Sequence, residues 1–89
     1  MEITKRASAG TMESSDVYVE IEPADGGIQL QLESVVMNQF GDSIERSVRE
    51  VLQEMSVANA NVRIIDRGAL DCVLRARVET AVLRGKGND

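Results

Sequence analysis

The spacing of apolar residues changes at Ser34 from every second position to every third or fourth, and this change constrains the fold more than any other feature. Before Ser34, apolar and polar residues alternate over residues 17–22 and 28–33. Alternation of this kind is typical of strands that bury one face. Residues 23–27 between them contain a proline and two glycines, as tight connections do. We therefore predict two strands that form a hairpin, with their apolar faces on one side.

After Ser34 the apolar residues recur every three or four positions, which predicts an amphipathic helix over residues 35–55 with Ser34 as its N-cap. Gly41 lies inside this helix, at a cost of about 1 kcal/mol relative to alanine, and marks a weak point or a close packing contact. We expect the apolar stripe to be core. It comprises Val36, Met37, Phe40, Ile44, Val48, Val51, Leu52 and Met55.

The rest of the chain predicts a third strand over residues 62–65 and a second helix whose apolar positions run from Leu70 to Val82. The predicted order is β-β-α-β-α, an α+β fold in a single domain over residues 1–89. We expect a small three-stranded antiparallel sheet, with residues 17–22 in the middle and two helices on one face. The crossover into the third strand should be right-handed. Residues 1–15 are interpreted as a flexible leader and residues 85–89 as a frayed tail.

The composition excludes several classes of function. The chain has a net charge of −5 and only two aromatic residues, so it is poorly suited to a phosphate backbone or to stacking bases. No apolar run could span a membrane, and no secretory signal is evident. The single cysteine, Cys72, forms no internal disulfide and fits a reducing cytoplasm. Without histidine, the chain lacks the commonest general base and metal ligand, so we expect neither catalysis by this chain alone nor a metal site.

Two short segments carry a resemblance to a known family. They are Gly10-Thr11-Met12-Glu13-Ser14-Ser15-Asp16, a small polar segment ahead of a strand, and Gly68-Ala69-Leu70-Asp71-Cys72, which opens the last helix and extends to Arg77. Together with residues 39–42, they resemble the acyl carrier (gamma) subunit of citrate lyase. In that family a serine is joined through a phosphodiester to phosphoribosyl-dephospho-coenzyme A. The matching residue is Ser14. Ser15 replaces the family's usual glycine and adds a second, less favoured hydroxyl.

The resemblance implies a non-catalytic carrier. In citrate lyase the thiol of the arm holds acetyl, the alpha subunit exchanges acetyl for citrate, and the beta subunit cleaves the citryl thioester to oxaloacetate. The implied partners are these two subunits and a transferase that attaches the arm, all in the cytoplasm. Two alternatives remain open within the class, the carriers of malonate decarboxylase and of citramalate lyase. A third, from another class, is a small α+β interaction module without a covalent cofactor.

Four other residues deserve a functional hypothesis. Ser43, in Gly41-Asp42-Ser43-Ile44, resembles the attachment serine of fatty-acid-type carriers, but those are helical bundles and Ser43 falls within a predicted helix. Cys72 could hold a thioester, although we favour a bystander role on the solvent side of its helix. Arg75 and Arg77 could contact phosphates of the arm or another subunit. The more ordinary interpretation is a solvated helix face, with Arg75 paired to Asp71 and Glu79.

Overall fold

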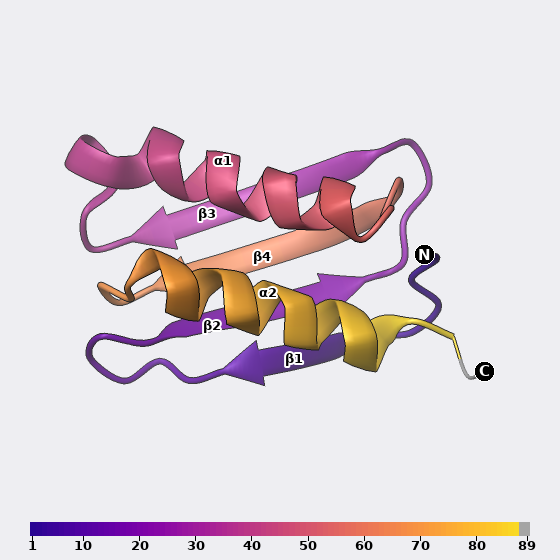
Figure 1. The fold of residues 1–89 in the computed structure, drawn as a ribbon, viewed down its shortest axis with the longest axis horizontal. Coiled ribbons are helices and arrows are strands. Elements are labelled where there is room, and N and C mark those ends of the chain that lie inside the picture. Colours follow the sequence, from indigo (N-terminus) through magenta and orange to yellow (C-terminus); the bar gives the residue numbers. More distant parts are fainter. Residues whose placement is uncertain (88–89) are drawn as a thin grey trace.

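The computed structural model describes residues 1–87 as a sheet with two helices packed on one face (Figure 1). The sheet has four strands in the order β1-β2-β4-β3, and the helices follow β3 and β4. The elements in chain order are β1 (Ala7–Gly10), β2 (Val17–Glu22), β3 (Ile28–Ser34), α1 (Met37–Glu54), β4 (Ala60–Asp66) and α2 (Asp71–Gly85). The α+β class and the two helices on one face are confirmed, whereas the three-stranded antiparallel sheet is wrong.

The sheet is mixed because β4 lies between β2 and β3. β4 pairs antiparallel with β2 and parallel with β3, so that Ile64 has Val19 on one side and Leu32 on the other. The predicted hairpin of β2 with β3 therefore does not form. Burial explains the order: Ile64 and Ile65 of β4 are both buried, whereas β3 alternates half-buried and exposed residues. A strand buried along most of its length gains most from two neighbours, and a half-exposed strand tolerates the edge.

The crossover from β3 through α1 to β4 is left-handed, contrary to the prediction. In Figure 1 both strands point to the left, α1 lies in front of them, and β4 lies below β3. β4 fills the position between β2 and β3, which fixes the direction of the crossover. The apolar face of the sheet, where Val19 and Ile21 of β2 are fully buried, fixes the side on which α1 packs. Together these constraints override the usual right-handed preference.

The expected flexible leader instead contributes to the fold. Residues 7–10 form the edge strand β1, which pairs antiparallel with β2, and Ile3 and Ala9 are buried. The segment Ala-Ser-Ala-Gly has no large apolar side chain, so alternation did not reveal it. At the other end, Gly85 closes α2 and Lys86 forms a bridge with Ile3. The rest of the expected frayed tail, residues 88–89, lies outside the described residues.

The helices match their predicted ranges to within a few residues but differ at their starts. The N-cap of α1 is Val36 rather than Ser34, which ends β3. The buried stripe of α1 includes Ile44, Val48, Val51 and Leu52, as expected, but Met37 and Phe40 are 42% and 54% exposed. The buried face of α2 comprises Leu74, Val78, Ala81, Val82 and Gly85. Over residues 1–87, neither helix combines the length and apolarity that crossing a membrane requires.

Candidate functional site: the Ser14 loop

Residues 11–16 join β1 to β2 and are called the Ser14 loop. The chain enters it through Gly10, whose φ is +88° and whose absent Cβ would lie 1.9 Å from the carbonyl oxygen of Val17. No other residue type can occupy that position without moving the backbone of β2. The two strands therefore approach each other closely at the base of the loop. This contact fixes where the loop leaves the sheet.

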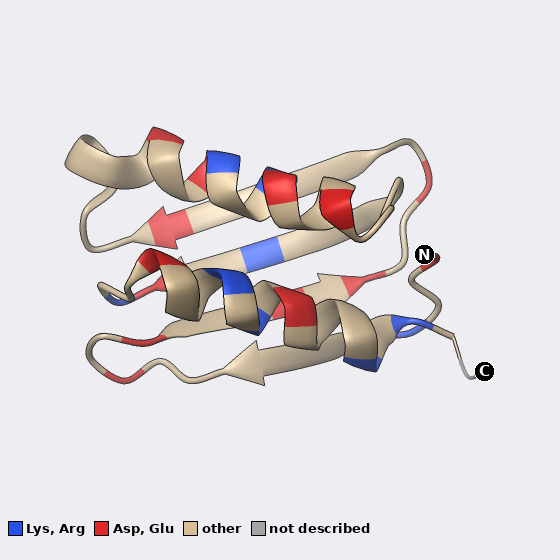
Figure 2. Ribbon diagram, in the orientation of Figure 1, with Lys and Arg blue, Asp and Glu red and all other residues tan. Residues whose placement is uncertain are grey.

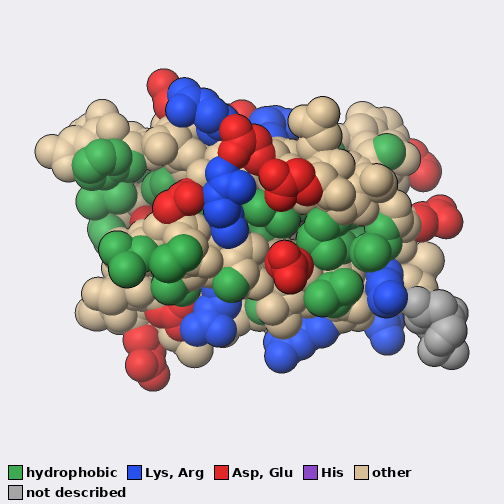
Figure 3. Space-filling view, in the orientation of Figure 1, with side chains coloured by type: hydrophobic (Ala, Val, Ile, Leu, Met, Phe, Trp, Pro, Cys, Tyr) green, Lys and Arg blue, Asp and Glu red, His purple; other side chains and the backbone are tan. Residues whose placement is uncertain are grey.

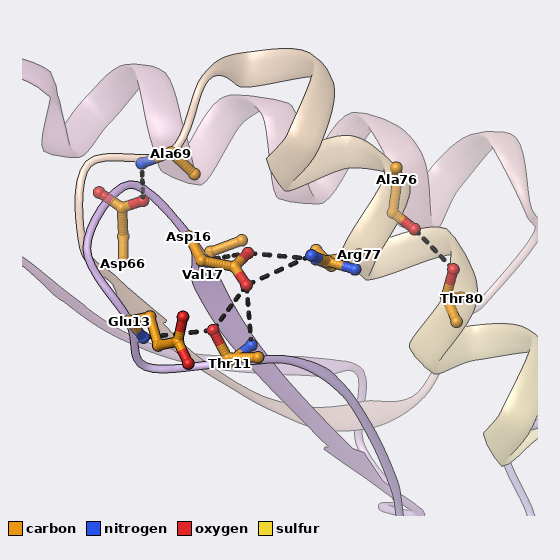
Figure 4. Close-up of polar contacts among 9 residues, drawn as sticks. All are labelled: Thr11, Glu13, Asp16, Val17, Asp66, Ala69, Ala76, Arg77 and Thr80. Carbon is orange, nitrogen blue, oxygen red and sulfur yellow. Dashed lines mark hydrogen bonds and ion pairs between the residues drawn. The ribbon is translucent and has the colours of Figure 1, made fainter.

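Asp16 holds the loop together from its far side (Figure 4). One carboxylate oxygen accepts hydrogen bonds from the Thr11 hydroxyl at 2.7 Å and the Thr11 backbone N–H at 3.2 Å, and the other accepts the Val17 N–H at 2.7 Å. The Arg77 guanidinium of α2 donates to both oxygens at 3.2 Å. A charge-assisted pair of bonds of this kind joins the loop to the helix.

The same contacts shift the ionisation of Asp16. The hydrogen bond from Thr11, the backbone N–H of Val17 and the Arg77 charge together lower the pKa of Asp16 to about 2. The Asp16 side chain is only 14% exposed, so water screens these interactions weakly. Asp16 is therefore a carboxylate that stays charged and ordered at any physiological pH.

The backbone of the loop is also joined to the segment that follows β4. Ser15 N–H donates to the Arg67 carbonyl at 2.8 Å, and Arg67 N–H donates to the Asp16 carbonyl at 2.9 Å. Ser15 adopts a φ of +65°, a left-handed conformation that costs a residue with a Cβ about 1 kcal/mol. The Arg67 side chain is exposed and forms no ion pair or hydrogen bond with residues 1–87. The backbone of Arg67 therefore lies beside Ser15 and Asp16, and its side chain is exposed and unpaired among residues 1–87.

Ser14 lies at the exposed part of this loop. Its hydroxyl makes no hydrogen bond within residues 1–87, although Thr11, Asp16 and Ser15 around it are all fixed. A free, solvent-facing hydroxyl on a backbone held at both ends can be reached by an enzyme and can carry a covalent group. Among residues 1–87, no basic side chain forms a hydrogen bond with it that could activate it as a nucleophile.

Asp66 holds together the two connections that lie next to the Ser14 loop. This role was not predicted from the sequence. It is buried, at 3% exposed, and accepts hydrogen bonds from the Ser34 hydroxyl at 2.8 Å and the Ala69 N–H at 3.0 Å. Its carbonyl accepts the Val35 N–H at 3.2 Å. One carboxylate therefore joins the turn after β3 to the loop after β4. An aspartate that ends a strand is a weak signal, because many such residues are solvated.

Both arginines proposed to contact phosphates are engaged within the chain. Arg77 binds Asp16, and Arg75 pairs with Asp71 at 2.9 Å and with Glu50 of α1. The predicted pair of Arg75 with Asp71 is confirmed. Its second partner is Glu50, and no pair with Glu79 is found among residues 1–87. Asp71 also accepts a hydrogen bond from Ser47, which with Arg75 lowers its pKa.

The two remaining candidates belong to the helices, and Ser43 lines a pocket together with residues 68–71. Ser43 is exposed in the second turn of α1, as its predicted place within a helix required, and not at a helix start. Cys72 is exposed near the start of α2, the solvent side expected for it. Among residues 1–87, no cluster of histidine, cysteine or acidic side chains is arranged to hold a metal ion.

Comparison with known proteins gives a consistent set of relatives. The family model described as ACP, malonate decarboxylase delta subunit (MdcD), matches residues 4–85. The chain is 60% identical to the citrate lyase acyl carrier protein of Escherichia fergusonii over 94% of this chain and 88% of that protein. The Klebsiella pneumoniae protein of the same name is 56% identical over the same shares.

A solved structure shows the same fold. A chain of a Pseudomonas malonate decarboxylase hetero-tetramer in complex with malonate superposes with a TM-score of 0.76 over 97% of this chain and 89% of that one, at 24% identity. At that identity the likeness concerns the fold alone. The family match and the sequence relatives extend over nearly the whole chain, including the Ser14 loop and the start of α2. The chain therefore belongs to the family of acyl carrier subunits that includes the citrate lyase acyl carrier proteins.

Proposed function

We propose that this chain is the acyl carrier subunit of a citrate lyase, with a prosthetic arm joined to the Ser14 hydroxyl. One observation supports this most directly: Ser14 is exposed and unbonded on a loop fixed by Asp16, in a chain 60% identical to a citrate lyase acyl carrier protein. The chain itself performs no chemistry. It presents acyl groups to the alpha and beta subunits, which act on them in the cytoplasm.

The proposed arm is phosphoribosyl-dephospho-coenzyme A, and the site fits an anionic group attached there. A phosphodiester at Ser14 would place a negative charge near Glu13 and Asp16. Asp16 already pairs with Arg77, and the backbone of Arg67, whose side chain is exposed and unpaired among residues 1–87, bonds to the backbone of Asp16. Arginine is well suited to phosphate oxygens. Arg67 is thus a better candidate for a phosphate contact than Arg75 or Arg77.

When attached, the arm supplies a thiol that holds the acyl group as an activated thioester. What this chain contributes is the position of the attachment atom. The Asp16–Arg77 pair and the Gly10 contact hold both ends of the loop to the body of the protein. Tethering raises the effective concentration of the acyl group at both partner active sites without new contacts.

A second candidate within the class is a malonate decarboxylase carrier. The description of the family model favours it, whereas sequence identity favours citrate lyase. The two differ in what the assembled complex cleaves. A complex rebuilt with this chain that cleaves citrate and leaves malonate intact supports the first proposal.

The proposal predicts an adduct on Ser14. The chain is purified from its native host during growth on citrate and cleaved after glutamate, which separates residues 14–20 from residues 34–45. We expect the mass of phosphoribosyl-dephospho-coenzyme A on the first peptide. The Ser14→Ala variant should fold normally, lose the adduct and abolish citrate cleavage, whereas Ser15→Ala and Ser43→Ala retain both. An adduct on the second peptide, or cleavage retained by Ser14→Ala, contradicts the proposal.

A further inference from the structure

Exposed apolar side chains are concentrated at the end of the molecule that carries the Ser14 loop. Large hydrophobic residues with high exposure there are Met12, Val35, Met37, Phe40 and Leu70, and elsewhere among residues 1–87 only Met1 and Leu83 are comparable. Figure 3 shows hydrophobic side chains over the first turns of both helices and a second group between their later turns. We call the surface formed by Val35, Met37, Phe40 and Leu70 the apolar end. Patches of this kind on a small protein commonly mark contact sites.

A pocket of about 310 Å³ opens on the apolar end. Its apolar lining comes from three segments that meet there. The apolar lining residues are Val36, Phe40, Ile44, Ala69, Leu70 and Leu74, and the remaining lining residues are Ser43, Asp66, Gly68 and Asp71. The pocket lies next to the Ser14 loop in space. The backbone of Arg67 bonds to the backbone of Ser15 and Asp16, and the two residues after Arg67, Gly68 and Ala69, line the pocket.

Leu70 and Phe40 contribute little to the fold. Leu70 is the N-cap of α2, a position where leucine is among the poorest residues and serine among the best, and its side chain is 71% exposed. Phe40 lies in the first turn of α1 with 54% of its surface in solvent. Neither side chain is needed to start its helix, and both expose apolar surface to water. Contact with a partner protein explains their presence more simply.

The charge around the apolar end indicates what kind of partner fits. Figure 2 shows acidic positions at the end of β3, in the first half of α1 and in the loop between β1 and β2, and a basic position in the loop between β4 and α2. In these segments, Glu13, Glu33 and Asp42 have no ion-pair partner among residues 1–87, and Arg67 is the unpaired cation. A second copy of this chain would bring the same carboxylates face to face. A partner that presents an apolar side chain flanked by lysine or arginine is complementary to both the pocket and its border.

We propose that the apolar end is the docking surface for the transferase that joins the arm to Ser14. This inference rests on the proposed function for the identity of the partner. The transfer forms a bond from Ser14 Oγ to phosphorus, breaks the bond from that phosphorus to the pyrophosphate leaving group of an activated donor, and releases the hydroxyl proton. The transferase must bring its active site to the loop, and a protein contact covers about 800 Å² per partner. Such a contact reaches the neighbouring pocket.

The test is the rate of arm transfer to the unmodified chain by the transferase from the same host, followed by intact mass. Leu70→Ser removes the most exposed apolar side chain and places a favoured residue at the N-cap, so its melting temperature should stay the same or rise. We expect kcat/KM for transfer to fall at least tenfold, mainly through KM. Phe40→Ser should behave similarly. Leu83→Ser, which changes an exposed leucine at the opposite end of α2, should stay within twofold of wild type.

Charge provides a second measurement. Asp42→Lys should also lower kcat/KM, and the wild-type rate should fall as NaCl is raised from about 50 to 300 mM. If wild type receives no arm at all, the proposed function is wrong. If wild type and Leu70→Ser are modified equally well, the docking proposal alone is wrong. It is likewise overturned if Leu70→Ser is loaded normally but lowers citrate cleavage, or if it converts a wild-type dimer to monomer.

Discussion

At the scale of single residues, the Ser14 loop depends on backbone conformations that most side chains avoid. Gly10 leaves no space for a Cβ against Val17, and Ser15 adopts a left-handed φ of +65°. The family resemblance places a glycine at position 15, which this conformation explains. Ser15 therefore carries strain that the usual glycine lacks.

Replacing Ser15 should relieve this strain. We expect Ser15→Gly to raise the free energy of unfolding by about 0.5 kcal/mol, because removing the Cβ relieves roughly 1 kcal/mol and the greater freedom of glycine in the unfolded chain offsets part of it. Urea denaturation measures the difference. Ser14→Gly is the matched control and should not stabilise, since positive φ is found at Ser15 and not at Ser14. Equal effects of the two substitutions would show that the backbone at Ser15 is unstrained.

At the scale of elements, the Asp16–Arg77 pair joins the Ser14 loop to α2 across 61 residues of sequence. Because the pKa of Asp16 is lowered to about 2 in the folded protein, from about 4 when unfolded, its contribution is complete above pH 4. The contribution is lost as the pH falls from about 4 to 2. The sequence showed both residues, but nothing local linked them.

The pH dependence gives a direct measurement of this pair. We expect Asp16→Asn to be less stable than wild type by about 1–2 kcal/mol at pH 5, and the difference to shrink towards zero near pH 2. Urea denaturation at both values isolates Asp16, since the other acidic groups titrate in both proteins. Arg77→Gln should show a similar but smaller loss. A difference that persists unchanged at pH 2 would mean that packing, and not charge, holds the loop.

At the scale of the whole molecule, the N-terminal segment completes the sheet. β1 covers the edge of β2. Gly85 of α2 packs closely against this region, because a Cβ added to it would lie 3.2–3.5 Å from atoms of Ile21, Lys5 and Ala7. Without β1, the buried face of β2 and the last turns of α2 would meet water. Residues that composition alone marks as a leader therefore belong to the core.

Truncation tests this directly. Deleting residues 1–10 should lower the free energy of unfolding by at least about 3 kcal/mol, a large part of the stability of a small domain, and broaden the thermal transition. Deleting only residues 1–2, which are exposed, should change the melting temperature little. A shorter chain that melts cooperatively within a few degrees of the full protein would restore the interpretation of a flexible leader.

The sequence alone determined what depends on neighbouring residues: the alternation of β2 and β3, the periodic faces of α1 and α2, and the serine segment with its family resemblance. The tertiary structure decided what depends on distant ones. It recruited residues 7–10 as β1, placed the most buried strand, β4, between β2 and β3, and so made the crossover left-handed. It also brought Arg77 to Asp16 and left Phe40 and Leu70 exposed. Pairing and burial are competitions among all segments for one core, and local spacing does not record their outcome.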